Sequence, residues 1–309
     1  MLDLGFVSAI LADYNLENVL KFASQHGFKC VEVMCWPRDN SDTRRYAGVS
    51  HVDVDTLDLQ GIANVKSRLR EYGLYFSGLG YYPNPLDPDP EKAEFYREHI
   101  KKVIRAAAKL NVPVVNTFIG RNPSLTIKEN LKLVAEHWPA IIKVAEECNV
   151  KIGIENCPMW YTDDEWPGGK NLATTPVIWD QLFEIIPSRI LGLNYDPSHL
   201  IWQMMDEIRP IYDYKERLHH IHIKDVKVYR DKLDRVGIMA NPGEYHSPKL
   251  PGLGDVNWKA FFAALTDIRY RGPVVIEVED KAYEGSLKDV QAAILTSRNY
   301  LKQFLGYDF

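Results

Sequence analysis

The sequence predicts an α/β fold: a single (β/α)8 TIM barrel whose one catalytic domain covers residues 1–309. Two observations carry this prediction. Eight short β-rich runs alternate with longer amphipathic segments along the chain, and eight strand–helix units fit the usual length of such a barrel. No G-x-G-x-x-G motif follows the first run and no change of composition marks a second domain, so a doubly wound open sheet is the weaker alternative.

The expected strands are short and rich in Val, Ile and Leu, as parallel strands covered on both faces are. In chain order they are residues 4–8, 29–35, 74–80, 112–120, 150–156, 190–196, 218–225 and 273–280. The last of these, PVVIEVED, carries Glu277 inside a β-branched run. A buried carboxylate is costly unless a positive group is paired with it, so Glu277 requires a cationic partner.

Segments with helical periodicity lie between the strands. Apolar residues recur at helical spacing through residues 90–110. Thr175 before Pro176 offers a capping residue and a proline at the first helical position, and Ser286 is a good cap for the last helix. Pro139 lies within another helical segment, where we expect a kink or break next to the preceding tryptophan.

Two long loops, 156–175 and 225–256, follow the fifth and seventh expected strands. Loops that follow the strands of a (β/α)8 barrel lie on its C-terminal face, where active sites are built. We therefore expect the functional residues at this face.

Composition limits the function classes. The chain carries 37 Lys and Arg against 42 Asp and Glu, and a formal net charge of −5 favours neither nucleic acid nor a membrane as a partner. No apolar run approaches the roughly 18 residues of a membrane span, and the N-terminus lacks the basic region of a signal peptide. The four cysteines have no C-x-x-C spacing, so we expect reduced thiols that serve packing in a cytoplasmic protein.

Side chains alternate between the two faces of a strand, so parity identifies the inward residues. On the last four expected strands the apolar residues share one face, which leaves a polar side chain pointing inward near each C-terminal end. These residues are Glu155, Asp196, His222 and Glu277. Four neighbouring strands thus aim three carboxylates and one imidazole at the barrel axis.

Three carboxylates at one point repel one another unless a cation lies between them. We therefore expect one divalent metal ion. Oxygen ligands with one nitrogen suit Mn²⁺ first, then Mg²⁺, Co²⁺ or Zn²⁺, and argue against a thiolate site. Taken singly, Asp196 is an ordinary helix cap and His222 an ordinary core histidine, and only their shared parity with Glu155 and Glu277 favours a metal site.

At these residues the sequence resembles the xylose-isomerase-like TIM-barrel family, which holds sugar phosphate isomerases and epimerases, tagatose 3-epimerase, hydroxypyruvate isomerase, inosose dehydratase and endonuclease IV. The motifs IGIENC, NYDPSH, HIHIKD, PGLGDVNW and IEVED carry this resemblance over essentially the whole chain. The segment DEWPGGKNLA (164–173) is similar to one sugar isomerase/epimerase branch.

The resemblance implies that Glu155, Asp196, His222 and Glu277 are metal ligands, and that the two glutamates also exchange protons with the substrate. His199, three residues after Asp196, matches a substrate-contacting histidine.

In the epimerase branch, an arginine on the loop beyond the metal histidine binds the sugar hydroxyls that lie farthest from the metal. Val228 stands at that spacing here, and Arg230 is a near match.

The function that the resemblance implies is enzymatic. It is a metal-dependent isomerase or epimerase of a non-phosphorylated keto sugar or polyol, acting by glutamate-mediated α-proton transfer through a metal-stabilised enediolate. The alternative is a lyase or dehydratase that performs β-elimination on a 3-keto sugar or 3-keto-glycoside with the same metal and base. The partner is a small-molecule sugar, and a homo-oligomer is a further option.

Two other function classes are disfavoured. An abasic-site nuclease of this fold needs extra histidines on the third and fourth strands, where GLGYYPN and NTFIGR have none. A sugar-binding barrel without catalysis is disfavoured because the ligand set and both glutamates are complete.

Further candidates lie on the expected mouth loops or point inward. Aromatic faces on these loops can stack on a sugar ring, with surface packing as the alternative; the residues are Trp36, Trp160, Trp166 and His246. Lys224 is expected either to bind a substrate oxygen or developing oxyanion, or to pair with Asp225 or Glu279. Glu32, inward on the second strand, is expected to be a buried structural acid.

Overall fold

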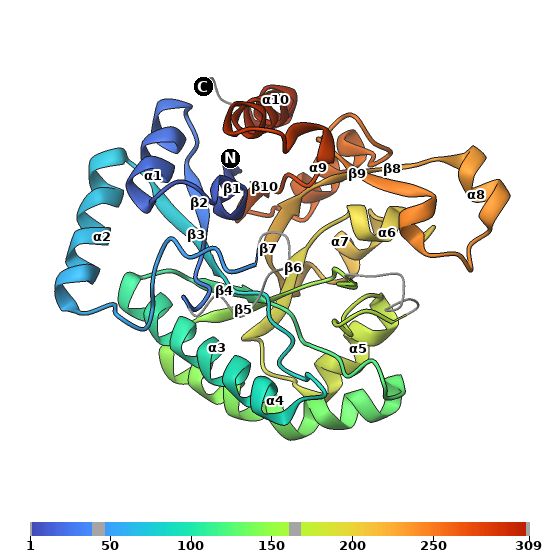
Figure 1. The fold of residues 1–309 in the computed structure, drawn as a ribbon, viewed down its shortest axis with the longest axis horizontal. Coiled ribbons are helices and arrows are strands. Elements are labelled where there is room, and N and C mark those ends of the chain that lie inside the picture. Colours follow the sequence, from blue (N-terminus) through green and yellow to red (C-terminus); the bar gives the residue numbers. More distant parts are fainter. Residues whose placement is uncertain (1, 39–46, 161–167, 307–309) are drawn as a thin grey trace.

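The computed structural model describes residues 2–38, 47–160 and 168–306, and its central feature is a closed barrel of eight parallel strands (Figure 1). The strand order around the barrel is β1-β10-β7-β6-β5-β4-β3-β2, so strands from the two ends of the chain pair with each other. Helices surround the barrel on its outside. The predicted fold class is confirmed.

All eight predicted barrel strands are present. The first has its expected length but begins one residue earlier, and the other seven are shorter than expected by one to five residues. They are β1 (Asp3–Val7), β2 (Cys30–Met34), β3 (Tyr75–Gly80), β4 (Val114–Thr117), β5 (Lys151–Glu155), β6 (Leu191–Tyr195), β7 (Leu218–Ile223) and β10 (Pro273–Ile276). The fourth strand differs most from its expected length. Its expected end, Gly120, has a φ of 85°, in the left-handed region that ends an extended strand.

Ten α-helices connect or follow these strands. They are α1 (Leu16–Gln25), α2 (Leu59–Tyr72), α3 (Pro90–Leu110), α4 (Ile127–Cys148), α5 (Pro176–Ile185), α6 (Ser198–Ile201), α7 (Arg209–Asp213), α8 (Arg230–Val236), α9 (Trp258–Asp267) and α10 (Leu287–Leu305) among the described residues. Ser286 caps α10 as predicted, because its hydroxyl accepts a hydrogen bond from the Asp289 backbone N–H. Thr175 precedes α5 but forms no such side-chain bond, so that part of the prediction is wrong.

Of the kink or break expected at Pro139, the break is wrong, because α4 continues through this proline to Cys148. Trp138, the residue before it, is fully buried and its indole N–H donates a hydrogen bond of 2.9 Å to the Ile119 carbonyl. This tertiary contact holds the centre of the helix against the loop after β4, which offsets the missing N–H of proline.

The apolar core lies between the barrel and the helices, as strand parity predicts. Tyr195 at the end of β6 packs outward against Trp179 of α5 and Phe261 of α9, with ring centroids 6.2 and 6.4 Å apart. All three side chains are buried. Full burial of a large apolar side chain contributes roughly 1.5–3 kcal/mol, so this layer stabilises the barrel strands from outside.

The barrel interior is polar at several levels. His220 on β7 is fully buried and hydrogen-bonds to Asn194 of β6 and Ser77 of β3, at 2.9 and 3.1 Å. A Cβ at Gly153 would lie 2.5 Å from the Asn116 side chain, so only glycine leaves room for that inward amide. Inward polar side chains are thus accommodated by partners and by small neighbours.

The loop after β7 contains a hairpin that the sequence reading did not predict. β8 (Asp225–Val228) pairs antiparallel with β9 (His246–Lys249), and together with α8 they extend beyond the barrel. Among the residues that the structure describes, no helix is long and apolar enough to cross a membrane. All four cysteines are free thiols, as expected.

Candidate active site

The four residues singled out by parity lie at the C-terminal end of the barrel. Glu155 ends β5, Asp196 directly follows β6, His222 lies near the end of β7, and Glu277 directly follows β10. His222 Nδ1 is 3.5 Å from Glu155 Oε1 and 3.4 Å from Glu277 Oε2. Ligand atoms of these three residues all lie within 4.8 Å of one another, so they could hold one metal ion.

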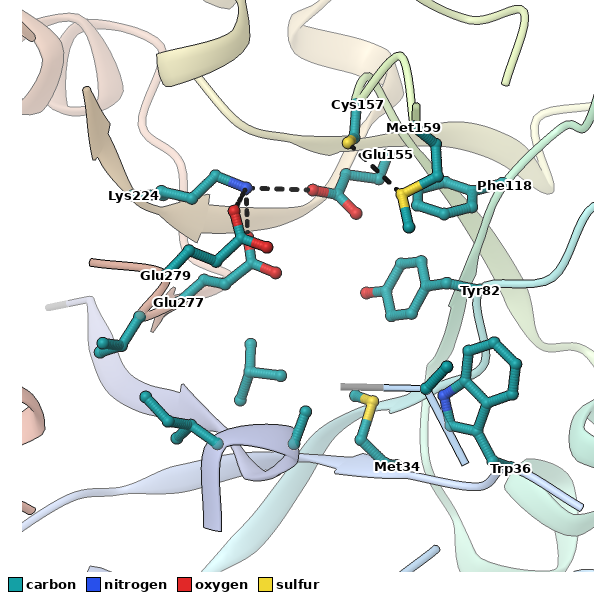
Figure 2. A pocket seen from close by; sticks show the side chains of 15 residues that line it. Met34, Trp36, Tyr82, Phe118, Glu155, Cys157, Met159, Lys224, Glu277 and Glu279 are labelled. Carbon is teal, nitrogen blue, oxygen red and sulfur yellow. Dashed lines mark hydrogen bonds and ion pairs between the residues drawn. The ribbon is translucent and has the colours of Figure 1, made fainter. Parts of the chain in front are cut away.

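Lys224 lies at the centre of the acidic groups (Figure 2). Its Nζ is 2.8 Å from Glu277, 3.0 Å from Asp196, 3.1 Å from Glu279 and 3.9 Å from Glu155. Burial lowers the pKa of Lys224, but the surrounding carboxylates more than offset this and hold the pKa well above its usual range. One ammonium does not neutralise four carboxylates, so the group retains an excess of negative charge beside His199 and His222.

Asp196 serves two partners. Its Oδ1 accepts a hydrogen bond of 2.8 Å from the Ser198 backbone N–H, which is the capping role that its position before a proline allowed. Its Oδ2 lies 3.0 Å from Lys224 and 3.2 Å from His199 Nε2. Burial raises the pKa of Asp196, but Lys224 and His199 outweigh burial and hold it well below the usual range. One oxygen is therefore structural and the other faces the acidic centre.

His222 is oriented by a buried acid. Its Nε2 lies 2.6 Å from Glu32 Oε2, and the Tyr82 hydroxyl donates a hydrogen bond to the other oxygen of Glu32. Burial raises the pKa of Glu32, but His222 more than offsets it and lowers the pKa to about 2. Burial lowers the pKa of His222, but Glu32 and Glu277 more than offset this and hold the pKa well above its usual range. When Nε2–H donates to Glu32 and Nδ1 gives up its proton, the Nδ1 lone pair faces Glu155 and Glu277.

The donor set fits a divalent cation. His222 Nδ1 is buried and makes no hydrogen bond to a described residue. Asp196 Oδ2 is buried and has ion-pair contacts with Lys224 and His199, but Lys224 is shared with three other acids. Buried polar atoms are normally paired, so an open imidazole nitrogen among carboxylates that share one ammonium indicates a place for a positive ion. Carboxylate oxygens with one imidazole nitrogen suit a hard or borderline divalent metal.

Two cavities open on this centre. The smaller, of about 70 Å³, has a mostly apolar wall that includes Met34, Trp36 and Phe118. The larger, of about 780 Å³, is bounded by the β8–β9 hairpin and the segments after β5 and β6. Both cavities border on Lys224 and Glu279. Groups bound in the two cavities would therefore meet at the acidic centre.

The predicted substrate-contacting residues divide between these cavities. Trp36 lines the smaller one, while His199, Trp160 and His246 line the larger one. In the larger cavity, Trp202 stacks on His246 with ring centroids 5.2 Å apart and an interplanar angle of 18°. Trp160 meets Trp202 edge-on at 4.9 Å. The three rings form an aromatic wall.

One predicted residue is not brought to the site. Arg230 begins α8, its side chain is 76% exposed, and it pairs with Asp234 at 3.1 Å. It lines neither cavity, because α8 carries it beyond the barrel mouth. Trp166 lies outside the described residues.

The expected pair of Lys224 with Glu279 is confirmed at 3.1 Å, and Glu279 also lines the larger cavity. Sequence reasoning missed two site residues: Trp202 lines the larger cavity, and Tyr82 contacts both Glu32 and His222. A signal existed for Trp202, which closely follows the NYDPSH motif. Tyr82 follows β3, and no pattern in its own strand indicated a role.

Known proteins similar to this chain share its fold and include sugar-modifying enzymes. A protein of Bacillus subtilis described as "Uncharacterized protein YfiH" is 27% identical over 98% of this chain and 99% of its own length. An inosose dehydratase of Clostridium perfringens is 28% identical, over 44% of this chain and 45% of its own length.

Solved structures show the same fold at low sequence identity. The IOLI protein with a bound zinc atom superposes with a TM-score of 0.72 and 15% identity, over 99% of this chain and all of that one. D-psicose 3-epimerase of Clostridium cellulolyticum, solved with D-tagatose, gives a TM-score of 0.68 and 15% identity over 98% and 99% of the two chains.

A family model described as xylose isomerase-like TIM barrel matches residues 20–303, nearly the whole of the barrel. The chain belongs to the xylose isomerase-like TIM barrel family.

Proposed function

We propose that this chain forms one catalytic domain that isomerises or epimerises a non-phosphorylated keto sugar or polyol with the help of a divalent metal ion. The observation that carries the proposal is the position of Glu155 and Glu277, which flank His222 Nδ1 at 3.5 and 3.4 Å. Two carboxylates at one centre can remove and return a proton. The excess negative charge around Lys224 disfavours a phosphorylated substrate.

Glu155, Asp196, His222 and Glu277 would hold the metal ion. Their oxygen-rich set favours Mn²⁺, with Mg²⁺, Co²⁺ or Zn²⁺ as alternatives. When bound, such an ion polarises a carbonyl and acidifies the adjacent C–H.

The side chains supply the remaining steps. One glutamate takes the proton from the carbon next to the carbonyl, and the other glutamate returns a proton. Return to the opposite face of that carbon gives an epimer, and return to the adjacent carbon gives an aldose–ketose isomer. Lys224 donates a hydrogen bond to the oxygen that gains negative charge, and the aromatic wall of Trp160 and Trp202 stacks on the ring.

A lyase reaction is the second candidate. The relative named inosose dehydratase favours it, and so does the larger cavity, whose 780 Å³ accommodates a substrate bigger than one sugar ring. The same glutamate would remove the α-proton, and a leaving group on the next carbon would depart as an alcohol or water. Product analysis separates the two reactions.

The test is a screen of keto sugars and 3-keto-glycosides in D₂O with added Mn²⁺. We expect deuterium at the carbon next to the carbonyl, and a primary isotope effect with α-deuterated substrate in case the site shields the exchanged proton. Glu155→Gln and Glu277→Gln should each lower the turnover about 10²- to 10⁴-fold while metal is still bound. Glu71→Gln, on the exposed face of α2, is the matched control. Near wild-type rates in both site variants would refute the two-glutamate mechanism.

A further inference from the structure

Cys157 faces the acidic centre rather than serving only as packing. It follows β5 by two residues, is half-buried and lines both cavities. Its Sγ, a carboxylate oxygen of Glu155 and an imidazole nitrogen of His199 all lie within 4.8 Å of one another. This group offers a sulfur, a nitrogen and an oxygen ligand. The group of Glu155, His222 and Glu277 offers two carboxylates and one imidazole instead.

The imidazole in this group, that of His199, is buried and faces the acidic centre. His199 is only 8% exposed, and neither of its ring nitrogens makes a hydrogen bond to a described residue. Its Nε2 lies 3.7 Å from Glu155 Oε1 and 3.2 Å from Asp196 Oδ2, so the ring is turned toward the same centre. A buried imidazole of this kind is a common metal ligand.

A second sulfur lies beside the thiol. Met159 Sδ is 3.8 Å from Cys157 Sγ (Figure 2). Met159 has a φ of 59°, which is uncommon for a residue with a side chain. Its carbonyl accepts a hydrogen bond from Lys170 N–H at 2.8 Å, and the Cys157 carbonyl accepts one from the Asn171 side chain at 2.6 Å. These bonds hold the backbone of the two sulfur-bearing residues, and the Cys157 sulfur lies within reach of His199.

We propose that Cys157, His199 and Glu155, with the Met159 thioether beside them, form a second metal site that takes thiophilic cations of the Zn²⁺ and Cd²⁺ class. Thiolate and imidazole ligands select such ions over Mg²⁺ and Mn²⁺. Binding displaces to solvent the Cys157 proton and the proton on the ligating nitrogen of His199, and the metal–sulfur and metal–nitrogen bonds take their places.

The shared residue gives this site a consequence for activity. Glu155 belongs both to this group and to the group of His222 and Glu277. A cation held by Cys157 would engage Glu155 and occupy the boundary between the two cavities. Thiophilic metal ions should therefore inhibit the enzyme.

The test is a Cd²⁺ and Co²⁺ titration of the metal-stripped protein, followed by ultraviolet absorption. Thiolate coordination gives a charge-transfer band that carboxylate and imidazole ligands do not give. We expect the band in the wild type. The matched control is Cys148→Ser, which removes a half-buried thiol on α4 and should keep the band. Cys157→Ser should lose the band, because no other thiol lies in this group.

The readout requires no turnover, so it stands apart from the proposed reaction. Glu277→Gln should keep the band, because Glu277 is not a ligand of this site. Absence of the band in the wild type, or its persistence in Cys157→Ser, would overturn the proposal.

Discussion

A glutamate is tolerated at the end of a β-branched run here because a cationic side chain meets it. Glu277 follows Pro273–Ile276, and its Oε2 accepts a hydrogen bond of 2.8 Å from Lys224. The ammonium reduces the cost of desolvating the carboxylate, but it is shared with three other acids. The residual negative charge is what suits this position to a divalent ion.

Glu32 is expected to control metal affinity without touching the metal. Its carboxylate fixes the tautomer of His222 through the 2.6 Å contact with Nε2. Glu32→Gln should weaken Mn²⁺ binding roughly 10- to 100-fold, as loss of an outer partner of a metal ligand typically does. Isothermal titration calorimetry measures the affinity, and ¹⁵N NMR reports the protonation of the two ring nitrogens of His222. An unchanged affinity in a folded variant would contradict the assignment.

Lys224 is expected to stabilise the barrel before any metal is added. Lys224→Met leaves buried carboxylates uncompensated, which should cost about 3–5 kcal/mol of unfolding free energy at neutral pH. Denaturant unfolding of the metal-stripped protein measures this loss. Lys227→Met, three residues along on an exposed pair with Asp255, is the control and should change stability little.

The same variant has a defined pH dependence. Lys224 is the main group that holds the pKa of Asp196 below its usual range, so the stabilisation exists above the unfolded pKa of about 4. As the pH falls below that value, Asp196 takes up a proton in the variant and the difference from the wild type shrinks. A loss that grows on acidification would contradict the assigned ion pairs.

At the scale of elements, strand parity accounted for most of the site. Period-2 alternation located the inward faces of β5, β6 and β7 and the inward Glu277 after β10, because a strand buried on both faces still alternates. Parity could not find Tyr82 or the β8–β9 hairpin. Their positions depend on long-range contacts, such as that of Tyr82 with Glu32, which no local pattern reveals.

The β8–β9 hairpin depends on one buried acid at its base. Asp225 accepts hydrogen bonds from the backbone N–H groups of Gly252 and Val256 and from the Trp258 indole, at 2.8, 3.1 and 2.8 Å. It does not pair with Lys224, which was one expectation from the sequence. Its carboxylate instead anchors the return of the loop to α9.

Asp225→Asn should therefore loosen this loop. An amide offers one acceptor oxygen where the carboxylate offers two, so at least one buried N–H loses its partner at a cost of about 1–3 kcal/mol. Denaturant unfolding gives the cost, and hydrogen exchange at Gly252 and Val256 should accelerate. Asp267→Asn, at the exposed acceptor of a hydrogen bond from Tyr212, is the control and should have little effect. Unchanged exchange at both amides would show that the acid does not anchor the loop.

At the scale of the whole molecule, the barrel joins distant parts of the chain into one centre. β1 pairs with β10, and the proposed ligands come from β5, β7 and the residues that follow β6 and β10. Eight strand signals and the helical periodicity between them predicted this closure. The aromatic wall of the larger cavity was only partly predictable, because the approach of Trp202 to His246 depends on how two loops fold against each other.

A ligand set drawn from four positions around the barrel couples metal binding to global stability. At a free Mn²⁺ concentration 100 times the Kd, mass action adds about 2.7 kcal/mol to the unfolding free energy. For a chain of 309 residues this should raise Tm by roughly 5 °C, measured by differential scanning calorimetry with and without metal. His222→Ala should lose most of the rise, referred to its own metal-free Tm, whereas Glu71→Gln on α2 should keep it. An equal rise in all three proteins would place the metal elsewhere, because only binding at the barrel centre depends on the imidazole of His222.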